Sequence, residues 1–234
     1  AGFLFVELFV ILLLRRLSQR LNHVIGQQSI ELNSRNEVLE QLVQGQSLAT
    51  ILESIVLAIE QIDTEASCSI LLLDSEGKHL IHGAAPNLPD IYNEAVGAGS
   101  CGTAAFTQSR VIVDDIQSHP YWVNYKEIAS KSNLGACWSE PIIGTNNKLL
   151  GTFAIYHHQP MSPTDEALKL IESAAQLAAV VIEHKTANDE QLLLSRVFDV
   201  AREGIMVTDS LGRIITVNPM FSEITGFSRD EAIG

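Results

Sequence analysis

Residues 136–158, ACWSEPIIGTNNKLLGTFAIYHH, decide the fold, because they place a short polar turn between two apolar runs. ACWSEPII (136–143) and KLLGTFAIYHH (148–158) have the length and the β-branched and aromatic content of strands. Gly144 to Asn147 supply the residue types of a tight turn. The stretch therefore predicts an antiparallel hairpin.

A second hairpin is predicted upstream, from SCSILLLD (67–74) and KHLIHGAA (78–85), with a turn at Ser75-Glu76-Gly77. A third, short strand is expected in RVIVDDI (110–116), followed by a helix from Trp122 to Ser130. The turn residues and the apolar runs thus alternate as they do in a sheet built from hairpins.

Helices are predicted on both sides of this strand region. Ser47 is a natural N-cap for an apolar face at helical spacing. Ser162-Pro163-Thr164-Asp165 combines a serine cap, an early proline and an acid, and predicts a helix reaching His184. The order indicates an α+β domain over residues 47–184, with a central antiparallel sheet and the terminal helices on one face. The irregular segment from Pro86 to Asn133 is expected to cover a pocket on the other face.

The composition limits the classes of partner and site. The net charge of −13, without a basic stripe, argues against nucleic acid as a partner. Three widely spaced cysteines, Cys68, Cys101 and Cys137, form neither a zinc motif nor a disulfide framework. No metal site is expected, and the cysteine usage fits a reducing compartment.

The first residues predict the end of a transmembrane helix. Residues 1–14, AGFLFVELFVILLL, carry one charge, Glu7, and are followed at once by Arg15 and Arg16. Positive charge after an apolar run is typical of the cytoplasmic end of a span. A buried helix of a soluble domain is the alternative. We expect a location at the bacterial inner membrane, with most of the chain in the cytoplasm.

Residues 15–46 predict a long helix. Apolar residues occupy most positions of a seam with alternating spacings of four and three, which is typical of a two-stranded coiled coil. They are Leu21, Ile25, Leu32, Leu39 and Leu42. Gln28 and Arg35 interrupt the same seam, so the coiled coil is expected to be weakened by polar core positions. The interpretation is a parallel homodimeric stalk, and the alternative is one amphipathic helix packed on its own domain.

The C-terminal part predicts the front of another domain. A new helix is expected after Asp189, so residues 185–197 form a connecting helix between the domains. EGIMVTDSLGRIITVN (203–218) has the pattern of a strand, a turn and a strand. Ser228-x-x-Glu231 is a capping box that opens a short helix. Residues 198–234 are too few to bury a core alone, so we expect the domain to continue.

Several motifs in order resemble the GAF family of small-molecule sensory domains. They are SILLLDSEGKHLIHGAAPNLP, GSCGTAAF, RVIVDDIQSHPYW, LGACWSEPI and LLGTFAIYHHQP. The tail GIMVTDSLGRIITVNPMFSEITGFSRDEAIG is similar to the opening of a PAS domain. This combination resembles the input half of bacterial membrane-bound signalling proteins. The resemblance implies an output domain beyond Gly234, a diguanylate cyclase or cyclic-di-GMP phosphodiesterase first and a histidine kinase second.

The stretch GAGSCGTAAF (97–106) leaves several roles open for Cys101. It resembles the motif of free methionine sulfoxide reductases, which are thiol enzymes of the same fold. Their upstream cysteine has no counterpart here, and Cys137 stands closer to Ser139-Glu140 than the reductase pattern requires. We therefore expect no catalytic residue, a glycine-permitted helix start, and Cys101 as a redox candidate. The lead-in before Gly97 is shorter than in similar GAF domains.

A small molecule is the expected ligand of the pocket, and its identity stays open, with haem and nucleotide both possible. Aromatic residues gather in the covering segment and the adjoining strand, where they can stack on a planar ligand. The candidate lining residues are Cys101, Thr103, Phe106, Trp122, Tyr125, Trp138 and Glu140.

Overall fold

The computed structural model describes residue 26, residues 29–89 and residues 99–234. The chain divides into two compact units, residues 1–182 and 183–234. The predicted membrane span, together with Leu21 and Ile25 of the predicted stalk, lies outside the described residues. In the part that is described, no helix has the length and apolar character needed to cross a bilayer.

The first unit contains a five-stranded antiparallel sheet in the order β2-β1-β5-β4-β3. Both predicted hairpins are confirmed as neighbouring strand pairs within it. The central strand β5 pairs with β1 and with β4 along most of its length. The bounds are β1 Ala66–Leu73, β2 Leu80–Ala84, β3 Val111–Val113, β4 Ala136–Ile143 and β5 Leu149–His157.

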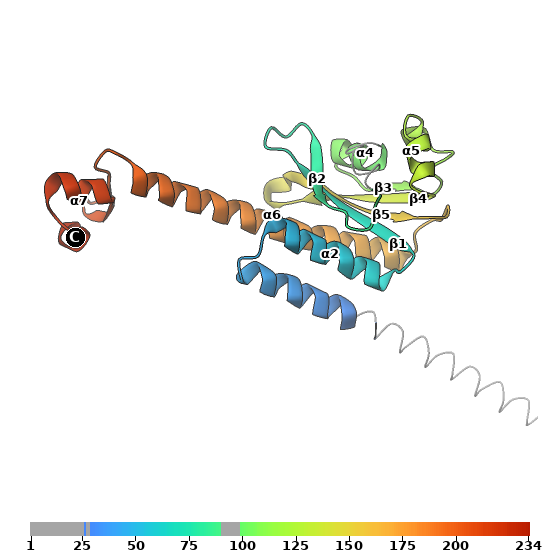
Figure 1. Cartoon of the computed structure of the whole chain (residues 1–234), viewed down its shortest axis with the longest axis horizontal. Helices are drawn as coiled ribbons and strands as arrows, with labels where there is room; N and C mark the ends of the chain where they lie inside the picture. Colours follow the sequence, from blue (N-terminus) through green and yellow to red (C-terminus); the bar gives the residue numbers. More distant parts are fainter. Residues whose placement is uncertain (1–25, 27–28, 90–98) are drawn as a thin grey trace, which may run out of the picture. The chain divides into compact units, whose positions relative to one another are not determined.

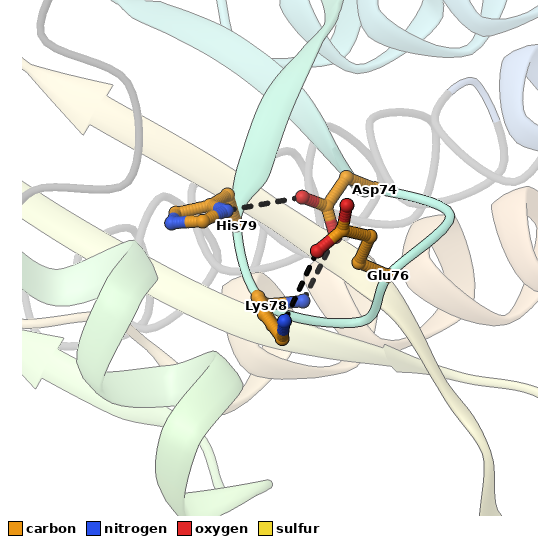
Figure 2. A network of polar contacts seen from close by, with 4 residues as sticks. All are labelled: Asp74, Glu76, Lys78 and His79. Carbon is orange, nitrogen blue, oxygen red and sulfur yellow. Dashed lines mark hydrogen bonds and ion pairs between the residues drawn. The ribbon is translucent and has the colours of Figure 1, made fainter.

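The turn between β1 and β2 is fixed by Asp74 (Figure 2). One carboxylate oxygen of Asp74 accepts a 2.8 Å hydrogen bond from the backbone N–H of Lys78, and the other lies 3.1 Å from Nδ1 of His79. Gly77 has a φ of +71°, a left-handed conformation that favours glycine. The hydrogen bond from Lys78 N–H lowers the pKa of Asp74. The predicted turn at residues 75–77 is thus held by its flanking acid.

Helices α2 (Leu48–Ile62) and α6 (Asp165–Val200) cover one face of the sheet (Figure 1), which we call the helix face. Ser47 caps α2 as predicted, with its Oγ accepting from Thr50 N–H at 3.2 Å. The apolar stripe of α2 is buried against the sheet together with side chains of α6, and each such side chain contributes about 1.5–3 kcal/mol to stability. The buried residues of α2 are Ile51, Leu52, Ile55, Val56 and Ile59.

Two details of α6 differ from the prediction. The helix is continuous to Val200, so no separate connecting helix begins after Asp189; neither glycine nor proline interrupts the polar residues in between. Its first turn is capped by Thr164, whose Oγ1 accepts from Ala167 N–H at 3.2 Å, and not by Ser162. The proline at 163 therefore lies before the helix.

A further helix over residues 29–43 packs on its own domain, which was the alternative to a free stalk. Val38 and Leu42 are buried in the core of the helix face, and Glu31 accepts a 3.0 Å hydrogen bond from Ser173 of α6. Leu32 and Leu39 of the predicted heptad stripe remain 60% and 37% exposed. One side of this helix is thus buried against its own domain, and another side leaves apolar side chains exposed.

The opposite face of the sheet is covered by α4 (Gly99–Thr107) and α5 (Lys126–Lys131), and we call it the α4 face. The 3₁₀ turn η1 (Pro120–Trp122) precedes α5, so the predicted helix from Trp122 to Ser130 begins later than expected. A second apolar cluster fills this side, including Leu71, Ala154 and Tyr156 of the sheet. The predicted two-sided α+β architecture is therefore present.

A hydrogen bond joins the C-terminal end of α2 to the end of β5. His157 is 3% exposed, and its Nε2 lies 2.9 Å from Oδ2 of Asp63, the C-cap of α2. The hydrogen bond from His157 lowers the pKa of Asp63. A carboxyl group whose pKa is lower in the folded state stabilises the fold above its unfolded pKa of about 3.9, and this contribution is lost as the pH falls through the folded value.

We therefore expect Asp63→Asn to flatten the acid limb of the stability curve. The free energy of unfolding of the wild type should fall more steeply between about pH 5 and pH 3 than that of the variant. Urea titrations at a series of pH values measure this difference. The exposed acids are the same in both proteins, so any difference in slope comes from Asp63. Parallel curves of unfolding free energy against pH would show that the contact between Asp63 and His157 adds nothing to the pH dependence.

The second unit begins within α6 and contains a hairpin, β6 (Met206–Thr208) and β7 (Ile214–Val217), followed by α7 (Pro219–Thr225) and α8 (Arg229–Ala232). The predicted strand–turn–strand and the Ser228–Glu231 capping box are confirmed. Asn218 is 1% exposed; its Oδ1 accepts from the N–H groups of Ile205 and Phe221, at 2.8 and 3.0 Å. This one amide ties the start of the hairpin to the start of α7.

Candidate functional site

The α4 face holds a group of buried thiols and hydroxyls, which we call the thiol–hydroxyl cluster. Its members come from β1, β4, β5 and α4, and each is at most 2% exposed. They are Ser69, Ser100, Cys101, Cys137, Ser139, Thr152 and Tyr156. Polar side chains buried in this way are costly unless they bond to one another, so their contacts define the site.

Cys101 lies at the centre of the cluster. Its Sγ is 3.4 Å from Oγ of Ser139 and 3.4 Å from the hydroxyl of Tyr156. Tyr156 in turn is 3.2 Å from Oγ of Ser69, and Ser139 is 3.6 Å from Sγ of Cys137. The hydrogen bonds therefore run across the three central strands, from β1 through β5 to β4.

The two thiols of the cluster have opposite electrostatic surroundings. Hydrogen bonds from Cys137, Ser139 and Tyr156 lower the pKa of the Cys101 thiol. Burial raises the pKa of the Cys137 thiol well above its usual value. Hydrogen-bond donors stabilise a thiolate, and an apolar environment destabilises one. The hydrogen bonds from Ser139 and Tyr156 therefore favour Cys101 as the more acidic thiol of the pair.

Trp122 closes the cluster on the α4 side. Its indole Nε1 donates a 2.9 Å hydrogen bond to Oγ of Ser100, and the ring is fully buried. Gly99, the first residue of α4, has a φ of +62°, and a Cβ there would lie 2.8 Å from the indole ring. The predicted glycine-permitted helix start is thus present at Gly99, for two reasons: its backbone angle and its contact with Trp122. Gly97 lies outside the described residues.

Two of the predicted pocket residues lie on the other side of the sheet. Trp138 belongs to the core of the helix face, where its ring centroid is 4.6 Å from that of His157. Glu140 pairs with Arg110, which also bonds Glu172 of α6 at 3.2 Å. Neighbouring residues of a strand point to opposite faces, so Cys137 and Ser139 of β4 face α4 while Trp138 and Glu140 cannot. The structure therefore does not bring Trp138 and Glu140 together with Cys101.

The remaining predicted residues lie on the α4 side but do not all face the cluster. Phe106 is 92% exposed, so its side chain is not part of the buried cluster. Thr103 donates to the carbonyl of Gly99 at 2.9 Å, within α4. Tyr125 is half-buried at the start of α5 and packs against the apolar cluster of the α4 face. Ser69, Ser100, Ser139, Thr152 and Tyr156 were not predicted.

The Arg110 pair with Glu140 gives a matched test of the helix face. Glu140 is 15% exposed and Glu172 is 53% exposed, and both contact the same guanidinium. We expect Glu140→Gln to lower the free energy of unfolding by about 2 kcal/mol, because it leaves a half-buried cation without its main partner. Glu172→Gln should cost less than about 0.5 kcal/mol, as exposed pairs do. Chemical denaturation of both variants checks this, and equal losses would contradict it.

The family profile of the GAF domain matches residues 45–183. The chain belongs to the GAF family. A PAS domain profile matches residues 192–234, so a PAS domain follows the GAF domain in the chain. The expected α+β GAF fold is confirmed.

One curated relative is the methyl sulfide methyltransferase-associated sensor of Methanosarcina acetivorans, which is 34% identical over 212 residues. The alignment covers 86% of this chain and 21% of that protein, so the chain spans about a fifth of its relative's length. The relative is a sensor by name. The GAF and PAS domains and this similarity support a sensory input region.

Solved structures share the GAF fold at low sequence identity. The GAF domain of a phosphoenolpyruvate-protein phosphotransferase from Coxiella burnetii is 18% identical, with a TM-score of 0.57, covering 68% of this chain and 96% of that one. A free methionine-R-sulfoxide reductase from Neisseria meningitidis is 15% identical, with a TM-score of 0.55, covering 69% and 91%. These likenesses show the fold alone.

Within the described residues, no three His, Cys, Asp or Glu side chains are grouped so as to hold a metal ion. The cluster instead offers one acidic thiol and several neutral hydroxyls. The hydroxyls of such a cluster can donate and accept hydrogen bonds, and its thiols can be oxidised.

Proposed function

We propose that this chain is the input region of a membrane-anchored signal-transduction protein, in which the GAF domain receives a signal at the thiol–hydroxyl cluster. The observation that carries the proposal is the continuity of α6. This helix packs on the GAF sheet through residues such as Ile171 and Ala178 and extends, unbroken, into the residues that match the PAS domain. Its 36 residues correspond to about 54 Å of helix. The similarity to a named sensor supports the same role.

The alternating side chains of β4 provide the route from the cluster to α6. Ser139 contacts Cys101 on the α4 face, and its neighbour Glu140 is tied through Arg110 to Glu172 of α6 on the helix face. A small molecule bound at the cluster, or a change in its thiols, shifts β4 and favours one packing of α6 over another. The proposed mechanism is a population shift between two helix packings.

A second copy of this chain is the proposed partner on the helix face. A groove with a cavity of about 230 Å³ lies among the helix at 29–43, α2 and α6, and it is lined mainly by apolar side chains. Leu39 and Val180 on its walls are 37% and 53% exposed. Leu32 and Leu39 repeat at the seven-residue spacing of a coiled coil. A parallel homodimer would bury these side chains and bring the two α6 helices together.

In this proposal the apolar residues 1–14 anchor the dimer in the inner membrane, with the domains in the cytoplasm. The output domain follows the PAS domain in this proposal; cyclic-di-GMP synthesis or breakdown is the first expectation and a histidine kinase the second. Neither activity belongs to the residues present here, to which we attribute no catalytic turnover.

Val180→Glu tests the dimer. The wild-type chain is expected to sediment as a dimer at micromolar concentration, and the variant as a monomer, because a carboxylate buried opposite its own copy is strongly unfavourable. Ile81→Glu is the matched control: Ile81 is 48% exposed on β2, away from the groove, and its replacement should leave the dimer intact. Sedimentation velocity measures all three proteins. A monomeric wild type, or a dimeric Val180→Glu, would overturn the proposed assembly.

A further inference from the structure

We propose that Cys101 and Cys137 form a reversible redox couple, which is oxidised by a small hydroperoxide such as hydrogen peroxide to an intramolecular disulfide. The inference rests on the proposed sensory function for its consequence, and on the geometry of the cluster for its chemistry. All three cysteines are free in the structure, and two of them meet in the thiol–hydroxyl cluster.

The two thiols are brought together by elements far apart in the sequence. Cys101 lies on α4 and Cys137 on β4, and both contact Oγ of Ser139, at 3.4 and 3.6 Å. The neighbouring thiol of Cys137 is also the main cause of the lowered pKa of Cys101. Two thiols that contact the same hydroxyl are close neighbours, and a disulfide forms when α4 and β4 let their sulfurs approach to about 2.05 Å.

The surroundings assign the order of the steps. Cys101 has the lowered pKa and so supplies the thiolate, while Cys137 is kept as a thiol by burial. The Tyr156 and Ser139 hydroxyls stabilise the anion at Cys101. Both cysteines are at most 2% exposed, which favours an oxidant of about the size of water over a bulky disulfide.

The reaction balances as follows for hydrogen peroxide. The Cys101 thiolate attacks one peroxide oxygen, the O–O bond breaks, and the departing hydroxide takes the proton that Cys101 had lost, giving water and a sulfenic acid. The sulfur of Cys137 then attacks the Cys101 sulfur, the S–O bond breaks, and the hydroxyl leaves with the Cys137 proton as a second water. Two thiols lose two electrons, and the peroxide is reduced to two waters.

The disulfide would move β4. The Cys137 sulfur would leave its contact with Ser139, and Cys101 would leave Tyr156, as α4 is drawn towards the sheet. Trp138, the next residue of β4, is packed in the core that includes α6, on the other face. Oxidation at the cluster is therefore coupled to the helix that leads towards the PAS domain.

Disulfide mapping of the whole chain tests the couple. The protein is purified without oxygen, treated with hydrogen peroxide, alkylated in denaturant and digested without reductant. We expect two of the three thiols to be lost, a linked peptide pair containing Cys101 and Cys137, and recovery of both thiols with dithiothreitol. Cys68 lies on the helix face and should remain alkylated, so it serves as an internal control.

Single variants then separate the two steps. Cys137→Ala should trap the sulfenic acid on Cys101, detected as a dimedone adduct, whereas Cys101→Ala should give no adduct on Cys137. Three results would overturn the proposal: disulfides that involve Cys68, disulfides between two chains, or no loss of thiols at peroxide concentrations that oxidise free cysteine. The disulfide map of the wild type shows which result holds, even if a variant fails to fold.

Disulfide mapping tests the redox couple and sedimentation tests the proposed dimer, so the two proposals can fail independently. If no disulfide forms, the sedimentation result for Val180→Glu is unaffected. If the disulfide forms in a chain that is monomeric, the redox couple stands and the proposed dimeric mechanism is overturned.

Discussion

Gly151→Ala is expected to lower the free energy of unfolding by about 3 kcal/mol or more. A Cβ at this position would lie 2.0 Å from the carbonyl oxygen of Leu71 and 3.1 Å from its carbonyl carbon. Gly151 pairs with Leu72 of β1 on one side and Ile142 of β4 on the other, so β5 cannot move away from either neighbour. Overpacking a well-filled interior costs about 1–3 kcal/mol, and a clash with backbone exceeds that range.

Gly77→Ala is the matched control, because it adds the same methyl group in open space. Only Leu73 approaches a Cβ at Gly77, at 4.0 Å, and the cost comes from the φ of +71° alone. That cost is about 1–2 kcal/mol for a residue with a side chain. Urea unfolding followed by circular dichroism compares the two variants. Equal losses would mean that β1 and β5 separate more easily than their register indicates.

The hairpins could be predicted from the sequence because their signals are local. The turn residues at 75–77 and 144–147 stand between apolar runs of strand length, and each pair of runs forms neighbouring strands. The end of α6 was less predictable. A polar run such as KTANDEQ reads as a boundary, but without glycine or proline nothing in it stops a helix.

The candidate site was predicted less well, because it depends on which face of each strand meets which layer. Alternation along β4 already separates Cys137 and Ser139 from Trp138 and Glu140. It does not say which set lies beneath α4. The same alternation in β5 puts Thr152, Ala154 and Tyr156 on one face. If the position of α4 over that face had been known, the hydroxyls of Thr152 and Tyr156 could have been predicted as neighbours of Cys101. That placement is a long-range contact, which no local pattern contains.

Trp122→Ala is expected to have two effects, a loss of stability of about 3–5 kcal/mol and a large rise in the reactivity of Cys101. The side chain is fully buried, and removing a buried tryptophan leaves a cavity whose cost falls in this range. The ring contacts Gly99 and bonds Ser100, the two residues before Cys101. Without it, the first turn of α4 loses its cover and opens more often.

Trp122→Phe separates the contribution of the aromatic ring from that of the indole hydrogen bond. It keeps an aromatic ring over Gly99 but removes the indole N–H, which leaves the fully buried hydroxyl of Ser100 without its donor. An unpaired buried polar group costs about 1–3 kcal/mol, so this variant should lie between the wild type and Trp122→Ala in stability.

Iodoacetamide labelling of the native protein, read by mass spectrometry at each cysteine, measures the opening of α4. We expect Cys101 to react at least ten times faster in Trp122→Ala than in the wild type, and Cys68 to react at an unchanged rate. Cys68 lies in the core of the helix face, so an equal rise at both positions would indicate global unfolding instead of local opening. An unchanged rate at Cys101 in a folded variant would contradict the role of Trp122 as the cover of the cluster. The comparison therefore distinguishes a cover over one thiol from a general loss of stability.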